Sequence, residues 1–209
     1  MKLWINQTSP YARKVRVVVK EKSLDDRVTL IDVDPWRDPA DLLEVTPLSR
    51  VPVLMTGDGI IITESDAICR YLDDLWRIPP MLPANAAARV EVSARIALVQ
   101  GMMDSAFDAA IELRRPANCQ WPDWIARQQR AVERALAIVA TWPRPDQRFD
   151  LGDAGLACLL GYLDFRHPAI AWRLRWPDLS VWFDDLSRRP SLASTSPNMP
   201  IVLADAPVV

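Results

Sequence analysis

Short apolar runs alternate with stretches of helical spacing over the first third of the chain. Residues 11–22 place Ala12, Val15, Val18 and Val19 on one helical face, whereas residues 28–33 are rich in β-branched side chains, which favour strands. The turn 56–59 separates two apolar runs and predicts a hairpin. We therefore expect strands at 3–5, 28–33, 51–55 and 60–62, and helices at 11–22, 39–44 and 67–75, in the order β-α-β-α-β-β-α.

The pattern changes after a proline-rich segment. Three prolines fall within residues 78–83, where they would stop a helix and suit an extended linker. The remaining periodic segments are all helical, at 85–113 (with a kink near Gly101), 124–139, 154–163 and 179–186. Residues 154–163 are apolar nearly all round and predict a central buried helix. The tail from Pro190 is expected to be irregular. These features predict two domains, 1–77 and 84–209, joined by a linker at 78–83.

Composition narrows the class of protein. A chain of 209 residues with net charge −2 shows no basic surface for nucleic acid or for acidic membranes. No apolar run is long enough for a signal peptide or a membrane span, and the three cysteines form no Cys-x-x-Cys pair. Together these features predict a cytoplasmic protein without a disulfide framework or a metal site. His167 is the only histidine, which argues against a Ser-His-Asp triad, and we expect it at a helix end or in a loop.

Ser9 and Pro10 stand between the first expected strand and the first expected helix. Ser9 is expected to cap this helix, with Pro10 in its first position. The same position can also carry chemistry, because a hydroxyl at a helix N-terminus lies beside unpaired N–H groups that favour an anion. From the residues alone, the capping role is the more economical interpretation.

Two further segments allow a structural and a functional interpretation. Val51-Pro52 either begins a strand with a trans proline or contains a cis bond that turns the Val51 backbone outward, free to pair with an extended peptide. Glu64-Ser65-Asp66 opens a helix, where the residues either cap it or hold a carboxylate and an amine of a ligand. Asp150 and Asp153, by contrast, are expected to be purely structural, as a capping box for the buried helix.

The order and spacing of these segments resemble the cytosolic glutathione transferase superfamily over nearly the whole chain. Residues 46–54, Thr-Pro-Leu-Ser-Arg-Val-Pro-Val-Leu, are similar to its N-P-x-G-x-V-P-x-L segment, with Thr46 for Asn and Ser49 for Gly. Residues 64–72, Glu-Ser-Asp-Ala-Ile-Cys-Arg-Tyr-Leu, are similar to its E-S-x-A-I-x-x-Y-L helix. The turn 9–16 is closest to bacterial serine-type members with S-P-x-x-R-K, and Asp150 replaces the hydroxyl residue of the family's S/T-x-x-D cap.

The resemblance implies a fold and a set of site residues. The expected fold is an α/β thioredoxin-like N-terminal domain followed by an all-α C-terminal domain. Val51 and Pro52 match the cis-proline segment that pairs with the cysteinyl part of glutathione, and Arg50 lies near that peptide. Glu64 and Ser65 match positions that bind the γ-glutamyl end, and Ser9 matches the hydroxyl that contacts the glutathione sulfur. The resemblance also implies a homodimer and a role in detoxification.

Serine at position 9 disfavours disulfide exchange, one of the reactions of this superfamily, and favours stabilisation of the glutathione thiolate. The turn Ser9-Pro10-Tyr11-Ala12 lacks the cysteine of thiol-exchanging relatives, so it cannot form a mixed disulfide there. A hydrogen bond to a thiolate, worth about 1.5–3 kcal/mol, together with the helix N-terminus would make the thiolate of glutathione a major species. We therefore predict an enzyme that uses glutathione as co-substrate and adds its sulfur to a small apolar electrophile.

The second substrate is less well specified by the sequence. Tyr11, Met102 and Met103 are candidates for lining the electrophile pocket, although ordinary core packing explains the two methionines equally well. The alternative to an enzyme is a non-catalytic module of the same fold that serves in interaction or regulation. Retention of Ser9, Glu64 and Ser65 together favours the enzyme.

Overall fold

A computed structural model describes residues 1–76, 78–144 and 149–197. Its N-terminal part contains a four-stranded sheet in the order β2-β1-β3-β4. β1 runs parallel to β2, whereas β3 is antiparallel to both β1 and β4, and Leu3 pairs with Leu30 on one side and with Leu54 on the other. The strands are β1 (Lys2–Ile5), β2 (Thr29–Asp32), β3 (Val53–Met55) and β4 (Ile61–Thr63).

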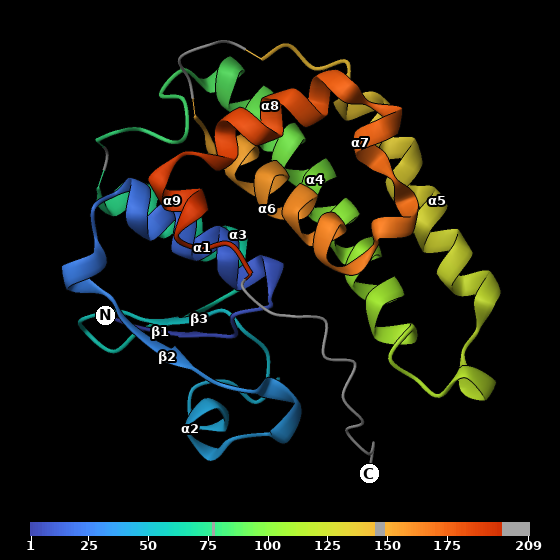
Figure 1. Cartoon of the computed structure of the whole chain (residues 1–209). Helices are drawn as coiled ribbons and strands as arrows, with labels where there is room; N and C mark the ends of the chain where they lie inside the picture. Colours follow the sequence, from blue (N-terminus) through green and yellow to red (C-terminus); the bar gives the residue numbers. More distant parts are fainter. Residues whose placement is uncertain (77, 145–148, 198–209) are drawn as a thin grey trace.

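Three helices cover the two faces of this sheet. α1 (Pro10–Glu21) and α3 (Ser65–Leu75) lie on the face toward the helical part of the chain, and α2 (Ala40–Leu43) lies on the opposite face (Figure 1). The α2 side is closed by a small apolar cluster in which Leu42 packs with Trp4 and Val53. This arrangement of strands and helices is the expected thioredoxin-like fold.

The rest of the described chain is helical. α6 is its centre, because nearly every residue from Leu151 to Leu163 is buried and the helix packs against both α4 and α1. The helices are α4 (Ala86–Glu112), α5 (Pro122–Val139), α6 (Leu151–Arg166), α7 (Trp172–Arg175), α8 (Pro177–Ser187) and α9 (Pro190–Ala193). Short 3₁₀ turns occur at Asp25–Arg27, Pro35–Arg37, Ala117–Cys119 and Pro168–Ile170.

Polar contacts reinforce the junction between the two parts. Glu21, at the end of α1, accepts hydrogen bonds from Arg189 and Ser191 near α9. Lys14 of α1 donates to the side chain of Gln100 on α4, over 3.0 Å. One apolar core also runs through both parts, so the helical part forms a fixed wall against α1 rather than a separate unit.

The structure confirms the expected order of elements, adds the short helix α7 between α6 and α8, and corrects two details. α4 continues without interruption through Gly101, where a kink was expected, and Pro190 opens the short helix α9 instead of an irregular tail. His167 ends α6 as expected, but it is buried and its Nε2 lies 2.8 Å from the carbonyl of Ala106 on α4. The rest of the predicted tail, from residue 198, lies outside the described residues.

The predicted linker at 78–83 falls between the end of α3 and the start of α4. The domain boundaries at 77 and 84 stay a prediction. Within the described residues, no helix combines the length and the apolar character needed to span a membrane.

Candidate functional site

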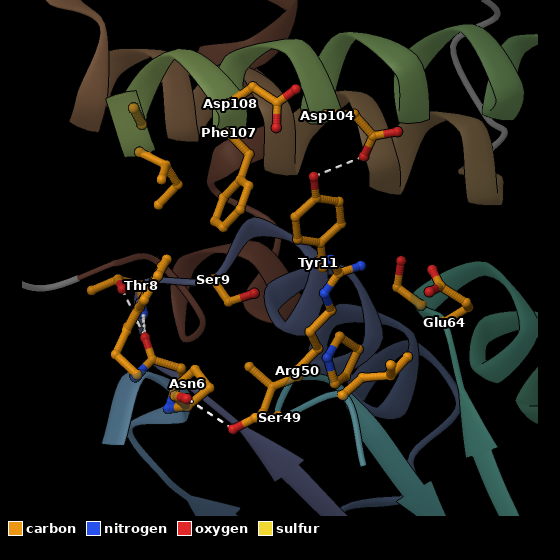
Figure 2. Close-up of a pocket in the computed structure, with 18 of the residues that line it drawn as sticks. Asn6, Thr8, Ser9, Tyr11, Ser49, Arg50, Glu64, Asp104, Phe107 and Asp108 are labelled. Carbon is orange, nitrogen blue, oxygen red and sulfur yellow. Dashed lines mark hydrogen bonds between the residues drawn. The ribbon is translucent and has the colours of Figure 1, made fainter. Parts of the chain in front are cut away.

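A cavity of about 870 Å³ opens between the sheet and the helical part. The loops after β1 and before β3, with the start of α3, form its floor, and α4 and α6 form the facing wall (Figure 2). The cavity brings together residues far apart in the sequence. Among those predicted as site residues, it is lined by Ser9, Tyr11, Arg50, Val51, Pro52, Glu64 and Ser65.

Ser9 is the N-cap of α1 and also faces this cavity. Its backbone is extended, Pro10 takes the first helical position, and the N–H of Ala12 donates to Ser9 Oγ over 3.2 Å. A serine hydroxyl has one donor and two acceptor sites, so capping uses only an acceptor site. The Ser9 O–H has no acceptor in the described part of the chain and is free to donate into the cavity.

The two neighbouring hydroxyls, of Thr8 and Tyr11, already donate hydrogen bonds within the protein. Thr8 Oγ1 donates to Asn6 Oδ1 over 2.7 Å, and the Tyr11 hydroxyl donates to Asp104 Oδ1 over 2.8 Å (Figure 2). Burial, followed by the hydrogen bond to Asp104 and its charge, raises the pKa of Tyr11 far above its usual value. Tyr11 therefore stays protonated, and Ser9 alone among the three offers an unassigned donor.

The segment before β3 presents backbone groups to the cavity. The Val51–Pro52 peptide bond is cis, which answers the question left open by the sequence. The backbone N–H and C=O of Val51 make no hydrogen bond to any other residue in the described ranges. Ser49, at φ 46°, donates its hydroxyl to the carbonyl of Pro35 over 2.9 Å and so fixes the approach to Arg50. The Arg50 side chain is exposed and lines the cavity.

The start of α3 supplies a second helix N-terminus. Glu64 precedes the helix with φ 68°, a left-handed conformation that is costly for a residue with a side chain. Its side chain is exposed, and it does not cap the helix, whose first residue Ser65 is buried. Asp66 pairs with the buried Lys14. The first N–H groups of α3 are therefore left facing the cavity without a side-chain cap from Glu64.

The facing wall is a stripe along α4. Gln100, Asp104, Phe107, Asp108 and Ile111 recur at helical spacing and line the cavity. Asp104 accepts from both Tyr11 and Gln100, and burial, followed by the charge of Asp104, raises the pKa of Asp108. The sequence analysis missed this stripe, although its spacing was readable.

Met102 and Met103 do not belong to this stripe. They are 3% and 0% exposed and pack in the core, and neither lines the cavity. The expectation that they line the electrophile pocket is therefore corrected. At 3.6 residues per turn, Met102 lies on the face of α4 opposite Asp104. Met103 lies at the edge of the stripe, one turn before Phe107, and its side chain is buried in the core.

Four residues that line the cavity have no local sequence signal; three of them, Trp36, Arg114 and Arg166, are exposed and define its mouth. Trp36 comes from the turn after β2, Arg114 follows the end of α4, and Tyr162 and Arg166 lie in the last two turns of α6. The guanidinium of Arg114 lies 4.8 Å from the ring centre of Trp36, so these two residues approach each other from opposite sides. Only the folded chain brings these four residues together.

Comparisons with known proteins agree with this geometry. Residues 8–75 match the family model of the glutathione S-transferase N-terminal domain, and residues 122–185 match that of the C-terminal domain. The chain is 30% identical to the uncharacterized GST-like protein YibF of Escherichia coli, over 94% of this chain and 98% of that protein.

Two solved structures are similar over nearly their whole length. A glutathione transferase family member from Pseudomonas fluorescens with bound glutathione has a TM-score of 0.88 and 33% identity, covering 95% of this chain and 99% of that one. A glutathione S-transferase from Methylobacterium radiotolerans in complex with glutathione sulfonate has a TM-score of 0.88 and 32% identity, covering 99% of each. With both domains matched and the fold shared along the chain, this protein belongs to the glutathione S-transferase superfamily.

Proposed function

We propose that this chain is a glutathione transferase that binds glutathione along the floor of the cavity and activates its sulfur with Ser9. In this arrangement, the cysteinyl part pairs with the free backbone groups of Val51, next to Pro52. The γ-glutamyl carboxylate lies at the N-terminus of α3 beside Ser65, and Glu64 accepts from its amine. Arg50 binds the second carboxylate of the peptide. The glutathione bound by the similar Pseudomonas fluorescens structure and the glutathione sulfonate bound by the Methylobacterium radiotolerans structure support this ligand.

The unassigned O–H of Ser9 is the observation that carries the proposal. A hydroxyl that accepts from Ala12 and donates to a thiolate stabilises the charged form of the sulfur at a helix N-terminus. Accepting a hydrogen bond from Ala12 makes the Ser9 O–H a stronger donor to the sulfur, because hydrogen bonds in a chain strengthen one another.

The positions of the native cysteines argue for thiolate stabilisation and against disulfide exchange. Cys69 and Cys158 are buried, and burial raises the pKa of both thiols, that of Cys69 to about 12. Cys119 is exposed but lies on a turn outside the cavity lining. In conjugation to an aryl chloride, the glutathione sulfur forms a bond to the ring carbon and chloride leaves with the electron pair of the broken bond.

A pair of variants tests the role of Ser9. Ser9→Ala is expected to lower kcat with a generic aryl chloride at least about tenfold, the equivalent of about 1.4 kcal/mol of lost thiolate stabilisation. Thr8→Val is the matched control, because it removes a neighbouring hydroxyl that already donates to Asn6. The ultraviolet absorbance of the bound thiolate, followed against pH, should show a higher pKa of glutathione in Ser9→Ala alone.

The outcomes separate the enzyme from a binding module of the same fold. Full turnover by Ser9→Ala, with an unchanged thiolate titration, would remove Ser9 from the mechanism. Tight binding of glutathione by the native chain, without turnover of any electrophile, would favour the non-catalytic alternative.

We further infer that the chain acts as a homodimer. Support comes from the resemblance to the superfamily and from large apolar side chains left exposed on successive elements of the described chain. These are Ile60 before β4, Leu75 at the end of α3 and Val90 in the second turn of α4. If these side chains form one contiguous patch, it would have the character of an interface.

A further inference from the structure

Two arginines of the cavity, Arg114 and Arg166, have no counter-ion in the part of the chain that the structure describes. Neither forms an ion pair or a side-chain hydrogen bond within residues 1–76, 78–144 and 149–197, although both are exposed and line the cavity. Other arginines near them are paired, as Arg115 is with Glu112 and Arg173 is with Asp164. Positive charge at the cavity mouth is therefore left available for a ligand.

The positions of these side chains are restricted by aromatic rings. Arg114 stacks over Trp36 at 4.8 Å and Arg166 over Phe165 at 4.0 Å, measured from guanidinium carbon to ring centre. Stacking of this kind leaves the guanidinium edges, which carry the N–H donors, open to a planar anion. Both arginines are thus partly ordered before a ligand arrives.

Tyr162 lines the same cavity and adds a third donor. Its ring is buried and also lines the cavity, and its hydroxyl has no hydrogen-bond partner in the described chain. Burial raises the pKa of Tyr162 to about 12 although the charges of Arg166 and Arg114 lower it, so the phenol keeps its proton at neutral pH. Burial lowers the pKa of Arg166, Tyr162 raises it, and the charge of Arg114 lowers it further.

The carboxylates of glutathione do not account for this cluster under the proposed function, on which the inference rests. Glutathione carries two carboxylates, and the N-terminus of α3 and Arg50 serve one each. The cluster of Arg114, Tyr162 and Arg166 lies instead at the ends of α4 and α6, on the wall that faces the second substrate. A charge that neutralises it must therefore come from the electrophile.

We propose that Arg114, Arg166 and Tyr162 bind a carboxylate of the second substrate, so that the enzyme selects acidic electrophiles rather than purely apolar ones. Planar carboxylates match the donor geometry of guanidinium groups. Asp104 and Asp108 fix the orientation, because a carboxylate turned toward these acids on α4 would meet like charge. The acid group points to the cavity mouth, and the reacting carbon points toward Ser9. Phe107 and Ile111 contact the apolar part between them.

Binding of stable product analogues tests this inference without requiring turnover. The probes are two S-benzyl glutathione thioethers, one with a carboxylate and one with a neutral carboxamide at the far end of the ring. Arg114→Gln and Arg166→Gln should each weaken binding of the acid at least about tenfold, while binding of the amide changes less than about twofold. Tyr162→Phe should have a smaller effect of the same kind. Arg115→Gln, which changes an exposed neighbour paired with Glu112, is the matched control.

Kinetics with a chlorodinitrobenzoate and its neutral amide extend the test to the reaction. After correction for uncatalysed rates, the native enzyme should prefer the acid, and the double variant of Arg114 and Arg166 should lose at least about 30-fold of that preference. KM for glutathione should stay unchanged. Ser9→Ala should lower turnover of both electrophiles and leave the preference of thioether binding intact, which separates failure of Ser9 from failure of this inference.

Three results would overturn the inference. Equal binding of the two thioethers by the native protein would show that no carboxylate is selected. Equal losses of acid and amide in the arginine variants would show that these residues only maintain the wall of the cavity. A raised KM for glutathione, with an unchanged ratio of acid to amide, would assign the arginines to the peptide instead.

Discussion

Ser9 shows how one small side chain can cap a helix and still offer a hydrogen-bond donor to a cavity. Its hydroxyl oxygen caps α1 by accepting from Ala12, and its proton remains free because capping requires only an acceptor. The sequence places both roles at this residue but offers no means of choosing between them. The choice depends on where the hydroxyls of Thr8 and Tyr11 donate, and these contacts exist only in the folded chain.

Replacing Ser9 by cysteine tests where this side chain points. In a Cys119→Ser background, which removes the exposed native thiol, Ser9→Cys places a thiol at the N-terminus of α1, where its pKa should fall below about 8.5. The thiolate should attack oxidised glutathione, form a mixed disulfide and release one reduced glutathione. Mass spectrometry should find one added glutathione at position 9.

The buried cysteines are the internal control of this experiment. Cys69 and Cys158 should stay unmodified, because burial raises the pKa of both thiols and denies access to oxidised glutathione. A folded Ser9→Cys variant that gains no glutathione would place residue 9 away from the sulfur and contradict the assigned mechanism.

At the scale of elements, the sequence predicted the long helices and the short helix α2, but not the short helices α7 and α9. α7 has only four residues, too few for a repeating apolar face. α9 was missed because Pro190 was interpreted as a break, whereas proline also favours the first position of a helix. Gly101 costs α4 about 1 kcal/mol relative to alanine, which a helix of 27 residues packed against α5 and α6 tolerates without a kink.

The site divides in the same way between what the sequence predicts and what it cannot. Ser9, Val51-Pro52 and Glu64-Ser65 could be found because each begins an element and carries a local signal. The face of α4 that carries Asp104 could have been found from the helical spacing of its residues. The prediction instead chose Met102 and Met103, because flexible methionine side chains suit an apolar pocket. Arg114 and Arg166 end two different helices, and no local pattern shows that these ends meet at one cavity.

The N-terminus of α6 carries the capping box expected from Asp150 and Asp153. Each carboxylate accepts from the backbone N–H of the other residue, at 3.0 and 3.1 Å, and Arg95 of α4 pairs with both. Asp153→Ala should lower the free energy of unfolding by about 0.5–2 kcal/mol, because it removes one half of the box and one partner of Arg95. Chemical denaturation measures this difference.

A surface pair gives the control for the capping prediction. Asp185 is exposed and pairs with Arg188 on the same helix, so Asp185→Ala should change stability by less than about 0.5 kcal/mol. Glutathione binding should be unchanged in both variants. An Asp153→Ala protein as stable as its parent would show that the box contributes nothing measurable.

For the whole molecule, the important fact is that neither part forms the site alone. The sheet side contributes hydroxyl, backbone and helix N-terminal groups, and the helical side contributes the acids of α4 and the arginines at the mouth. The shared core, together with the hydrogen bonds that Arg189 and Ser191 donate to Glu21, fixes the position of one side relative to the other. Under the proposed function, glutathione and the second substrate are therefore bound by different parts of the chain.

The proposed homodimer is a prediction about this molecule as a whole. The monomer mass is 23.6 kDa, and light scattering at micromolar concentration should return twice that value. Val90 is 69% exposed near the start of α4, so Val90→Glu should shift the equilibrium toward the monomer, because charge would be buried without a partner. Ile138→Glu, which changes an equally apolar residue 54% exposed on α5, should leave the mass unchanged. A native protein that elutes and scatters as a 23.6 kDa monomer would contradict the homodimer.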